Sequence, residues 1–149
     1  MKGFLLLLSF FAVLAVSAQK VMNRGASEAS WKVLWGKKSL LKAAAEDEAA
    51  NVVSIKRSAL NKKNTFTILF TPASDQKSGW NRSIAAYDGS DNVLKQQKGN
   101  SFSVSSAALR AMAKGHSEIR IYTTAVPSDP AKAAVVRVRR VHLVTIRIV

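Results

Sequence analysis

The stretch Thr65-Phe66-Thr67-Ile68-Leu69-Phe70-Thr71 decides the fold class of this chain. Phe66, Ile68 and Phe70 occupy every second position, so these three large apolar side chains share one face of an extended segment. Threonine, isoleucine and phenylalanine are also residues that strands favour. Pro72 follows, and because proline cannot donate to a ladder it ends the segment. The pattern predicts a β-strand with one face in a core.

Shorter segments of the same kind lie on both sides, separated by polar turns at spacings of about ten residues. Such spacing is typical of an antiparallel sandwich. The sequence therefore predicts a mainly β protein, an antiparallel β-sandwich (Ig-like or jelly-roll-like) of about seven or eight strands, with an open barrel as the alternative. These strands would come from the apolar or alternating segments at residues 31–35, 39–42, 51–57, 65–71, 80–87, 93–95, 101–105, 118–122 and 135–149, not all of which need form one.

Helix signals are few and short. Ser105 or Ser106 can cap a helix over Ala107–Lys114, with Gly115 at the C-terminal cap. In the loop 123–134, Asp129 and Pro130 form a capping pair that predicts one helical turn over 131–134. A further helical turn is expected around 44–49, where alanines and acidic residues follow a strand.

The chain ends in Val135–Val149, which is rich in valine, isoleucine and arginine. Its alternation changes phase near Arg139 and Arg140, because Val136 and Val138 precede that point in one phase and Val141 follows in the other. A β-bulge explains such a change. We therefore expect one long, bulged final strand.

The first eighteen residues predict export. Lys2 gives a positive start, Phe4–Val16 is apolar, and Val16-Ser17-Ala18 matches a cleavage site for a signal peptidase. The apolar run is short for a membrane anchor, since a bilayer core needs roughly 20 residues. We expect a helical signal peptide over 1–18, a flexible arm over 19–30 and a single domain over 31–149. The product would be periplasmic or extracellular in a bacterium, soluble and without a membrane span.

Composition narrows the partners. The chain contains no cysteine, which excludes a disulfide scaffold. Its formal charge is +14 at pH 7, and it falls to +13 when Lys2 leaves with the signal peptide. Such a charge attracts polyanions, although it can also serve solubility alone. Because export argues against nucleic acid, the expected partner is an anionic envelope glycan or another envelope protein; the oligomeric state stays open.

Arginines near the end of the chain are the first candidate site. Arg137, Arg139 and Arg140 lie close together, and the arginine fork suits phosphate, sulfate and carboxylate groups. Lys56 and Arg57 would extend the patch if their strand lies beside it. The alternative is a solvated strand face whose charges discourage edge pairing.

Tryptophans give a second, stacking candidate. Trp31 and Trp35 share a face with Val33, which favours core packing for both. Trp80 stands at a loop–strand junction and is the tryptophan expected to be exposed, where it could stack on a ligand.

No catalytic residue, metal site or cofactor is predicted. The two histidines, His116 and His142, lack cysteine partners for zinc, and His142 is expected to be half-buried in the last strand. Residues 88–92 carry oxygen ligands at alternate positions, but without a following glutamate they favour a hairpin turn over a calcium loop. The leading hypothesis is a non-enzymatic envelope module. The alternatives are a polysaccharide hydrolase or lyase that uses one of the histidines, and an assembly subunit that pairs through an edge strand.

Overall fold

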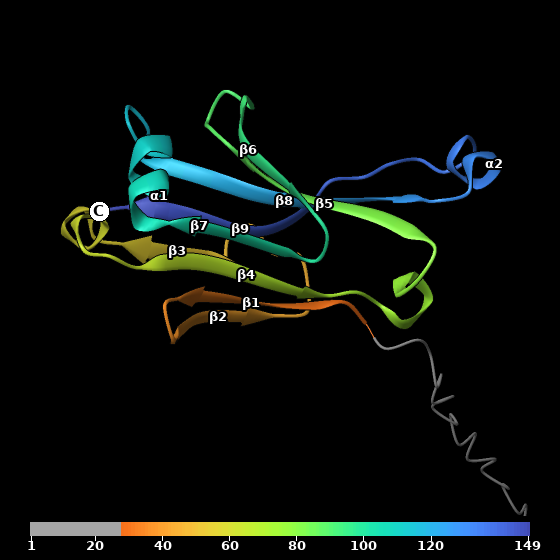
Figure 1. Ribbon diagram of the computed structural model, residues 1–149, viewed down its shortest axis with the longest axis horizontal. Coiled ribbons are helices and arrows are strands. Elements are labelled where there is room, and N and C mark those ends of the chain that lie inside the picture. Colours follow the sequence, from red (N-terminus) through yellow and green to blue (C-terminus); the bar gives the residue numbers. More distant parts are fainter. Residues whose placement is uncertain (1–27) are drawn as a thin grey trace, which may run out of the picture.

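The structure is a computed structural model that describes residues 28–149. These residues are mainly β and form two sheets that enclose one core (Figure 1). The predicted signal peptide, and all but the last three residues of the predicted arm, lie outside the described residues. Ser30, the last residue of that arm, already belongs to the first strand.

The first sheet has four antiparallel strands in the spatial order β2-β1-β4-β7. Their bounds are β1 (Ser30–Trp35), β2 (Lys38–Ala43), β4 (Thr65–Thr71) and β7 (Ser101–Ser105). Strand β4 confirms the segment that the sequence marks most clearly. It is central, with Phe66 opposite Trp35 of β1 and Val104 of β7. Gly36, at a φ of +60°, makes the tight turn from β1 to β2.

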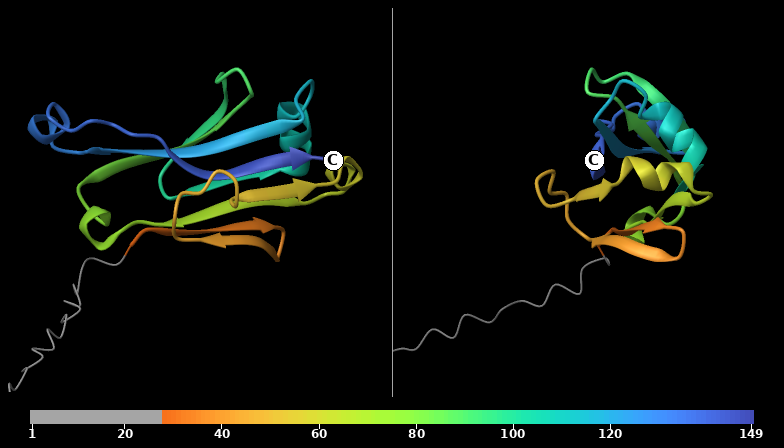
Figure 2. Two further views of the ribbon diagram at one scale, coloured as in Figure 1. Left: turned by 180° about the vertical axis from the view of Figure 1, so that it is seen from behind. Right: turned by 90° about the vertical axis from the view of Figure 1, so that its left-hand side faces the viewer.

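The second sheet has five strands in the order β3-β9-β8-β5-β6. Their bounds are β3 (Val52–Ile55), β5 (Trp80–Tyr87), β6 (Val93–Lys98), β8 (Glu118–Pro127) and β9 (Val141–Ile148). All pairs are antiparallel except β3 with β9, where Val53 lies opposite Ile146 in a parallel register. The expectation of a purely antiparallel fold is wrong at this pair. The loop 44–51 crosses from one sheet to the other and delivers β3 in the direction of β9 (Figure 2).

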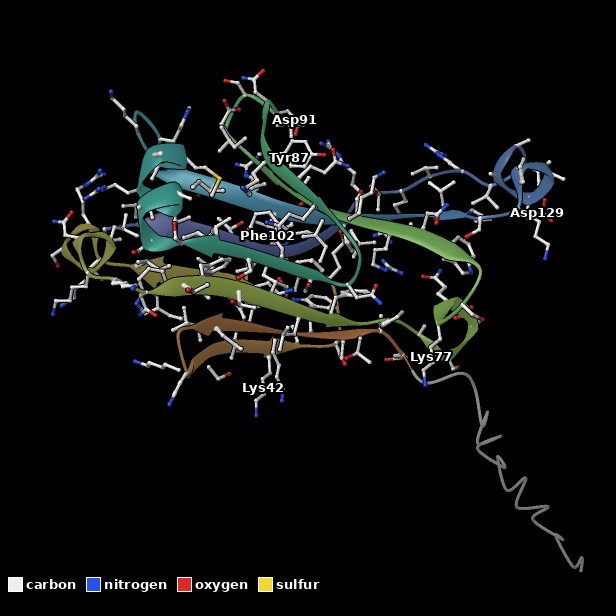
Figure 3. All side chains as sticks on the ribbon, viewed as in Figure 1. Lys42, Lys77, Tyr87, Asp91, Phe102 and Asp129 are labelled. Atoms are coloured by element: carbon white, nitrogen blue, oxygen red, sulfur yellow. The ribbon has the colours of Figure 1, made fainter. Side chains whose placement is uncertain are left out.

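The core lies between the two sheets. Alternate residues of both sheets are buried there, and Phe102 of β7 points into it (Figure 3). The indole Nε1 of Trp31, in the first sheet, donates to the carbonyl oxygen of Leu143, in the second, at 2.8 Å. The largest fully buried apolar side chains are Phe66, Phe102, Leu60, Ile68, Ile84, Leu109, Ile119, Ile121, Leu143, Ile146 and Val33. Burial of these side chains is the main term that holds the sheets together.

Short helices close the two ends. One end carries α1 (Ser106–Met112), the 3-10 helix η1 (Arg57–Asn61) and the C-terminus, and the other carries α2 (Pro130–Ala133) and η2 (Ser74–Gln76) (Figure 1). The Ser105 hydroxyl caps α1, and the Asp129 carboxylate caps α2 with Pro130 behind it, as the sequence predicts. No helix among residues 28–149 is long and apolar enough to cross a membrane.

The final strand is shorter than predicted. Residues 135–140 form no strand, and β9 begins at Val141. The pairing of β8 with β9 ends where Val141 is opposite Thr123, and residues 135–140 continue without a ladder although β8 itself runs on to Pro127. The bulge also moves: Leu143 is the extra residue between His142 and Val144, rather than Arg139 or Arg140. This bulge turns the Leu143 carbonyl toward Trp31.

Other boundaries differ because distant partners decide them. The sequence predicts a loop after Tyr122, but β8 runs on to Pro127 because β5 pairs with it from Trp80 onward. Residues 28–149 form nine strands rather than seven or eight, because every candidate segment contributes one. The expected helical turn at 44–49 is a hydrogen-bonded turn without a helix, in which the Asp47 carboxylate accepts from the N–H groups of Ala49 and Ala50.

Candidate anion-binding site

The three predicted arginines lie on an irregular, exposed segment between α2 and β9. Because this segment is not a strand, Arg137, Arg139 and Arg140 do not share one face. Arg137 and Arg139 line one hollow, whereas Arg140 contacts the β5–β6 hairpin, so only part of the predicted patch exists as one surface.

Arg140 is paired. Its guanidinium donates two hydrogen bonds to the Asp91 carboxylate, both 2.9 Å long. Its Cζ lies 5.0 Å from the ring centre of Tyr87 and 5.1 Å from that of Tyr122. The hydrogen bonds to Asp91 raise the pKa of Arg140, and the same bonds lower the pKa of Asp91. Arg140 therefore has a resident counter-ion on the β5–β6 hairpin, where Figure 3 shows Tyr87 and Asp91 close together.

Arg139 is also paired. It bonds to one carboxylate oxygen of Glu46, from the crossing loop 44–51. The other oxygen accepts the backbone N–H of His142 at 2.7 Å. Glu46 therefore fastens the loop to the start of β9 and holds the Arg139 side chain in place.

Arg137 and Arg139 meet Trp80 at a hollow of about 260 Å³. We call it the basic hollow; its polar and aromatic wall comprises Gln76, Trp80, Arg82, Thr123, Arg137 and Arg139. Two of the three predicted arginines and the predicted tryptophan thus converge, together with an arginine that the sequence analysis did not single out. Within residues 28–149, neither Arg137 nor Arg82 forms an ion pair.

Arg82 is the central residue of the basic hollow. Its guanidinium lies 4.3 Å above the ring centre of Phe70 and donates to Gln76 Oε1 at 2.8 Å and Thr123 Oγ1 at 3.3 Å. Burial lowers the pKa of Arg82, because the charged form loses water and gains no carboxylate. A cation held in this way is stabilised by any anion that enters the hollow.

Local strand geometry explains the position of Arg82. Along β5, Trp80, Arg82 and Ile84 project to the inner face, and Ile84 is fully buried in the core. On the opposing sheet, Phe70 is the last inward residue of β4, and η2 follows with Gln76. The core therefore ends at Arg82, and the basic hollow lies beyond it, between Gln76 of η2 and the segment that follows α2.

Trp80 is half-buried and lines three neighbouring hollows. Besides the basic hollow, one of about 350 Å³ lies toward Val135 and Lys132. Another, of about 550 Å³, lies toward Asn81 and Gln96. The indole thus stands at a junction of concave surfaces, where one face of a ligand ring could pack against it.

Lys56 and Arg57 do not join this site. They are exposed at the opposite end, where the Arg57 backbone N–H donates to the carbonyl oxygen of Val149 at 2.7 Å. The length of the molecule separates them from Trp80, since β3 ends beside the C-terminus (Figure 1).

The histidines lie elsewhere. His142 is fully buried, whereas the sequence predicts a half-buried residue; its Nε2 shares a hydrogen bond of 2.9 Å with Thr145 Oγ1, and Nδ1 has no partner in the described structure. Burial lowers the pKa of His142. His116 Nε2 is 4.0 Å from an Asp88 oxygen.

The polar groups of the predicted hairpin turn form hydrogen bonds with one another. Asp88 accepts hydrogen bonds from the backbone N–H groups of Ser90 and Asn92 and from the Asn92 side chain, and these bonds lower its pKa. Among residues 28–149 no group of three or more acidic, histidine or cysteine side chains is placed to hold a metal ion.

The sequence pattern could have identified Arg82 as a candidate site residue. In the segment 80–87 it has the same parity as Ile84 and Ala86, the residues predicted to face the core. A charged residue at an inward position indicates either a buried ion pair or a site. The choice between the two depends on whether a carboxylate from a distant strand reaches it, and that is not visible in the sequence.

Comparisons with protein-family models, with curated proteins and with solved structures found no match for this chain.

Proposed function

We propose that this protein is an exported, non-enzymatic β-sandwich module of a bacterial cell envelope that binds anionic ligands in the basic hollow. The observation that carries the proposal is the half-buried guanidinium of Arg82, which has no carboxylate partner in residues 28–149 and faces a hollow shared with Arg137.

Charge and geometry support this function. Arginine forks match phosphate, sulfate and carboxylate groups with two parallel hydrogen bonds. The net charge, +14 for the full sequence and +13 once Lys2 has left, draws anions toward the whole molecule and raises their association rate. In contrast, Arg140 and Arg139 are held by Asp91 and Glu46, so Arg82 and Arg137 are the two of these four arginines without a carboxylate partner in residues 28–149.

The sandwich assignment rests on two separate sheets over one core. Along one side, β6 and β7 are joined through the Gln97 side chain, whose amide donates to the Ser103 carbonyl and accepts the Ser103 N–H at 2.8 and 2.9 Å. A side chain replaces the ladder there, so the sheets do not continue into each other. This supports an Ig-like or jelly-roll-like sandwich over an open barrel.

The binding test compares two variants that each lose two positive charges. Arg82→Gln with Arg137→Gln alters the basic hollow, and Lys56→Gln with Arg57→Gln alters the far end. We expect the first to elute from a heparin column at clearly lower salt, with a flatter dependence of affinity on salt, and the second to shift much less. Equal shifts would show that net charge, and not this hollow, retains the protein.

Export has its own test. Residues 1–30 are fused to an alkaline phosphatase that is active only outside the cytoplasm. We expect activity and a new N-terminus at Gln19, and we expect Leu6→Arg with Leu7→Arg to abolish both because charges interrupt the apolar run. An inactive wild-type fusion of full length would contradict export.

The alternative functions gain no specific support. Neither His142, which is fully buried, nor His116 lines the hollows around Trp80, so no histidine stands at the proposed ligand site. Assembly through a free final strand is not favoured either, because β9 has β3 on one side and β8 on the other.

A further inference from the structure

We propose that the ligand is an acidic oligosaccharide that runs from the basic hollow across Trp80 into the hollow of about 550 Å³ beside it, which we call the polar hollow. This inference rests on the proposed function and adds the chemical class and the path of the ligand. A single small anion would fill the basic hollow alone.

The polar hollow has the chemistry of a sugar subsite. Its wall carries neutral hydrogen-bonding side chains: Asn81, Ser83, Gln96 and Thr124. They form a network in which Ser83 Oγ lies 2.9 Å from Thr124 Oγ1 and accepts from Gln96 Nε2 at 3.1 Å. Hydroxyls and amides both donate and accept, as sugar hydroxyls require.

A path joins the two hollows around the edge of β5. Trp80 and Arg82 project to the inner face and Asn81 and Ser83 to the outer face, yet Trp80 and Arg82 line both hollows. The partner strand β6 ends at Lys98, opposite Ser83, and Gly99 then donates to the Arg82 carbonyl at 2.8 Å. Beyond that point β6 leaves β5 uncovered, so a chain can pass over Trp80 from one face to the other.

The two hollows divide the recognition between them. Arg82 and Arg137 bind an acidic group, the indole of Trp80 packs on the apolar face of a sugar ring, and the amides and hydroxyls bind the next unit. Lys98 stands at the outer rim and suits a second acidic group. The polar hollow lies in the size range of small-molecule sites, whereas a lone sulfate would leave it empty.

Single-stranded nucleic acid is a weaker fit. Such strands bind through successive aromatic platforms, one for each stacked base. In the walls of these two hollows, Trp80 is the one aromatic side chain. The structure therefore favours an alternating arrangement of acidic groups and hydroxyls over a row of bases.

The test compares two probes by calorimetry, inorganic sulfate and a sulfated heparin tetrasaccharide. Asn81→Ala with Gln96→Ala removes two neutral groups of the polar hollow. We expect it to weaken tetrasaccharide binding about tenfold, because two hydrogen-bonding groups of the subsite are lost, and to leave sulfate affinity unchanged. Trp80→Ala should likewise weaken the tetrasaccharide more than sulfate. Arg82→Gln should weaken both probes.

A control pair keeps the comparison matched. Ser54→Ala with Asn61→Ala removes two exposed polar groups at the far end and should change neither affinity; urea unfolding of each variant checks that it folds. If Asn81→Ala with Gln96→Ala weakens both probes equally, or neither, the oligosaccharide path is wrong while the basic hollow still stands. If Arg82→Gln changes neither affinity, or neither probe binds the wild type, the proposed function itself fails. A thymidine oligonucleotide of matched charge that binds more tightly than the tetrasaccharide, and depends on Trp80, would overturn the glycan class.

Discussion

Arg140 and Arg82 are the same side chain in two opposite situations. Both lie over aromatic rings, Arg140 over Tyr87 and Tyr122 and Arg82 over Phe70. Arg140 has the Asp91 carboxylate at 2.9 Å, whereas Arg82 has an amide and a hydroxyl. The pKa of Arg140 is accordingly raised and that of Arg82 is lowered.

The comparison separates arginines whose charge is neutralised by a carboxylate of the protein from arginines whose charge can bind a ligand. An aromatic ring can support a guanidinium at either kind of position. Whether the charge is free for a ligand depends on a nearby carboxylate. Asp91 of the neighbouring hairpin supplies one to Arg140, whereas no carboxylate among residues 28–149 pairs with Arg82. Arginines close in sequence, such as Arg137 and Arg140, therefore need not share a role.

The supporting rings give the largest expected effect. Phe70 is 7% exposed and stacks on Trp31 with ring centres 6.2 Å apart, whereas Tyr87 is half-buried. Phe70→Ala should lower the free energy of unfolding by about 3–5 kcal/mol. Tyr87→Ala should lower it by less than half as much. Urea unfolding measures both, and equal losses would show that the two arginines rest on equally structural rings.

Exchanging each arginine for methionine should separate binding from stability. Arg82→Met keeps the packing on Phe70 and removes a desolvated charge, so stability should stay the same or rise. Its anion affinity should fall about tenfold or more, since charge-assisted hydrogen bonds are lost. Arg140→Met should lower stability only slightly, because its ion pair with Asp91 is largely exposed, and should leave the affinity within about twofold. Calorimetry measures the affinities and urea unfolding the stabilities. If Arg140→Met lost the affinity and Arg82→Met did not, Arg140 and not Arg82 would be the binding residue.

Local patterns in the sequence identify most of the fold. Strands β4, β5 and β7 fall on the predicted residues because apolar residues alternate there and Pro72, Asp88 or Ser105 marks an end. The caps at Ser105 and Asp129 are equally local. Residues 135–140 have a strand pattern too, but a strand also needs a neighbour, and β8 is paired with β9 only from Val141.

Less of the site than of the fold could be predicted from the sequence, because the ion pairs join side chains from distant segments of the chain. The residues around Arg139 and Arg140 do not predict that Arg139 pairs with Glu46 and Arg140 with Asp91, because both carboxylates are distant in the sequence. The sequence placed Trp80 correctly at a strand start, and its partner Arg82 lies two residues on. Parity alone makes Arg82 unusual, and only the fold shows that its hydrogen bonds go to neutral groups.

His142 should make the stability of the paired region depend on pH. Its ring meets that of Tyr122, 5.4 Å away, and burial lowers its pKa against the opposing charges of Glu48 and Glu46. The unfolded chain then binds more protons than the folded chain below about pH 6.5. The free energy of unfolding should therefore decrease as pH falls from that point toward the folded pKa, by up to about 1.4 kcal/mol per pH unit.

The measurement is urea unfolding between about pH 7.5 and about pH 5, where Asp88 and Asp91 stay charged because their pKa values are lowered. His142→Gln should flatten the pH dependence, whatever its effect at neutral pH. Anion affinity at Arg82 should not change across this range, since an arginine remains charged. An unaltered slope in the variant would mean that the folded chain takes up a proton at His142 as readily as the unfolded chain.

The smallest effect should come from releasing Arg140. Asp91 has a φ of +66°, which asparagine tolerates, so Asp91→Asn removes the counter-ion without straining the turn. Both partners are largely exposed, and stability should hardly change. The freed Arg140 should now attract anions, so the variant should elute from heparin at slightly higher salt than Asp129→Asn, which also loses one negative charge but releases no arginine. Identical elution would mean that Asp91 is not what prevents Arg140 from binding anions. Arg140 and Arg82 would then differ only in how deeply their side chains are buried.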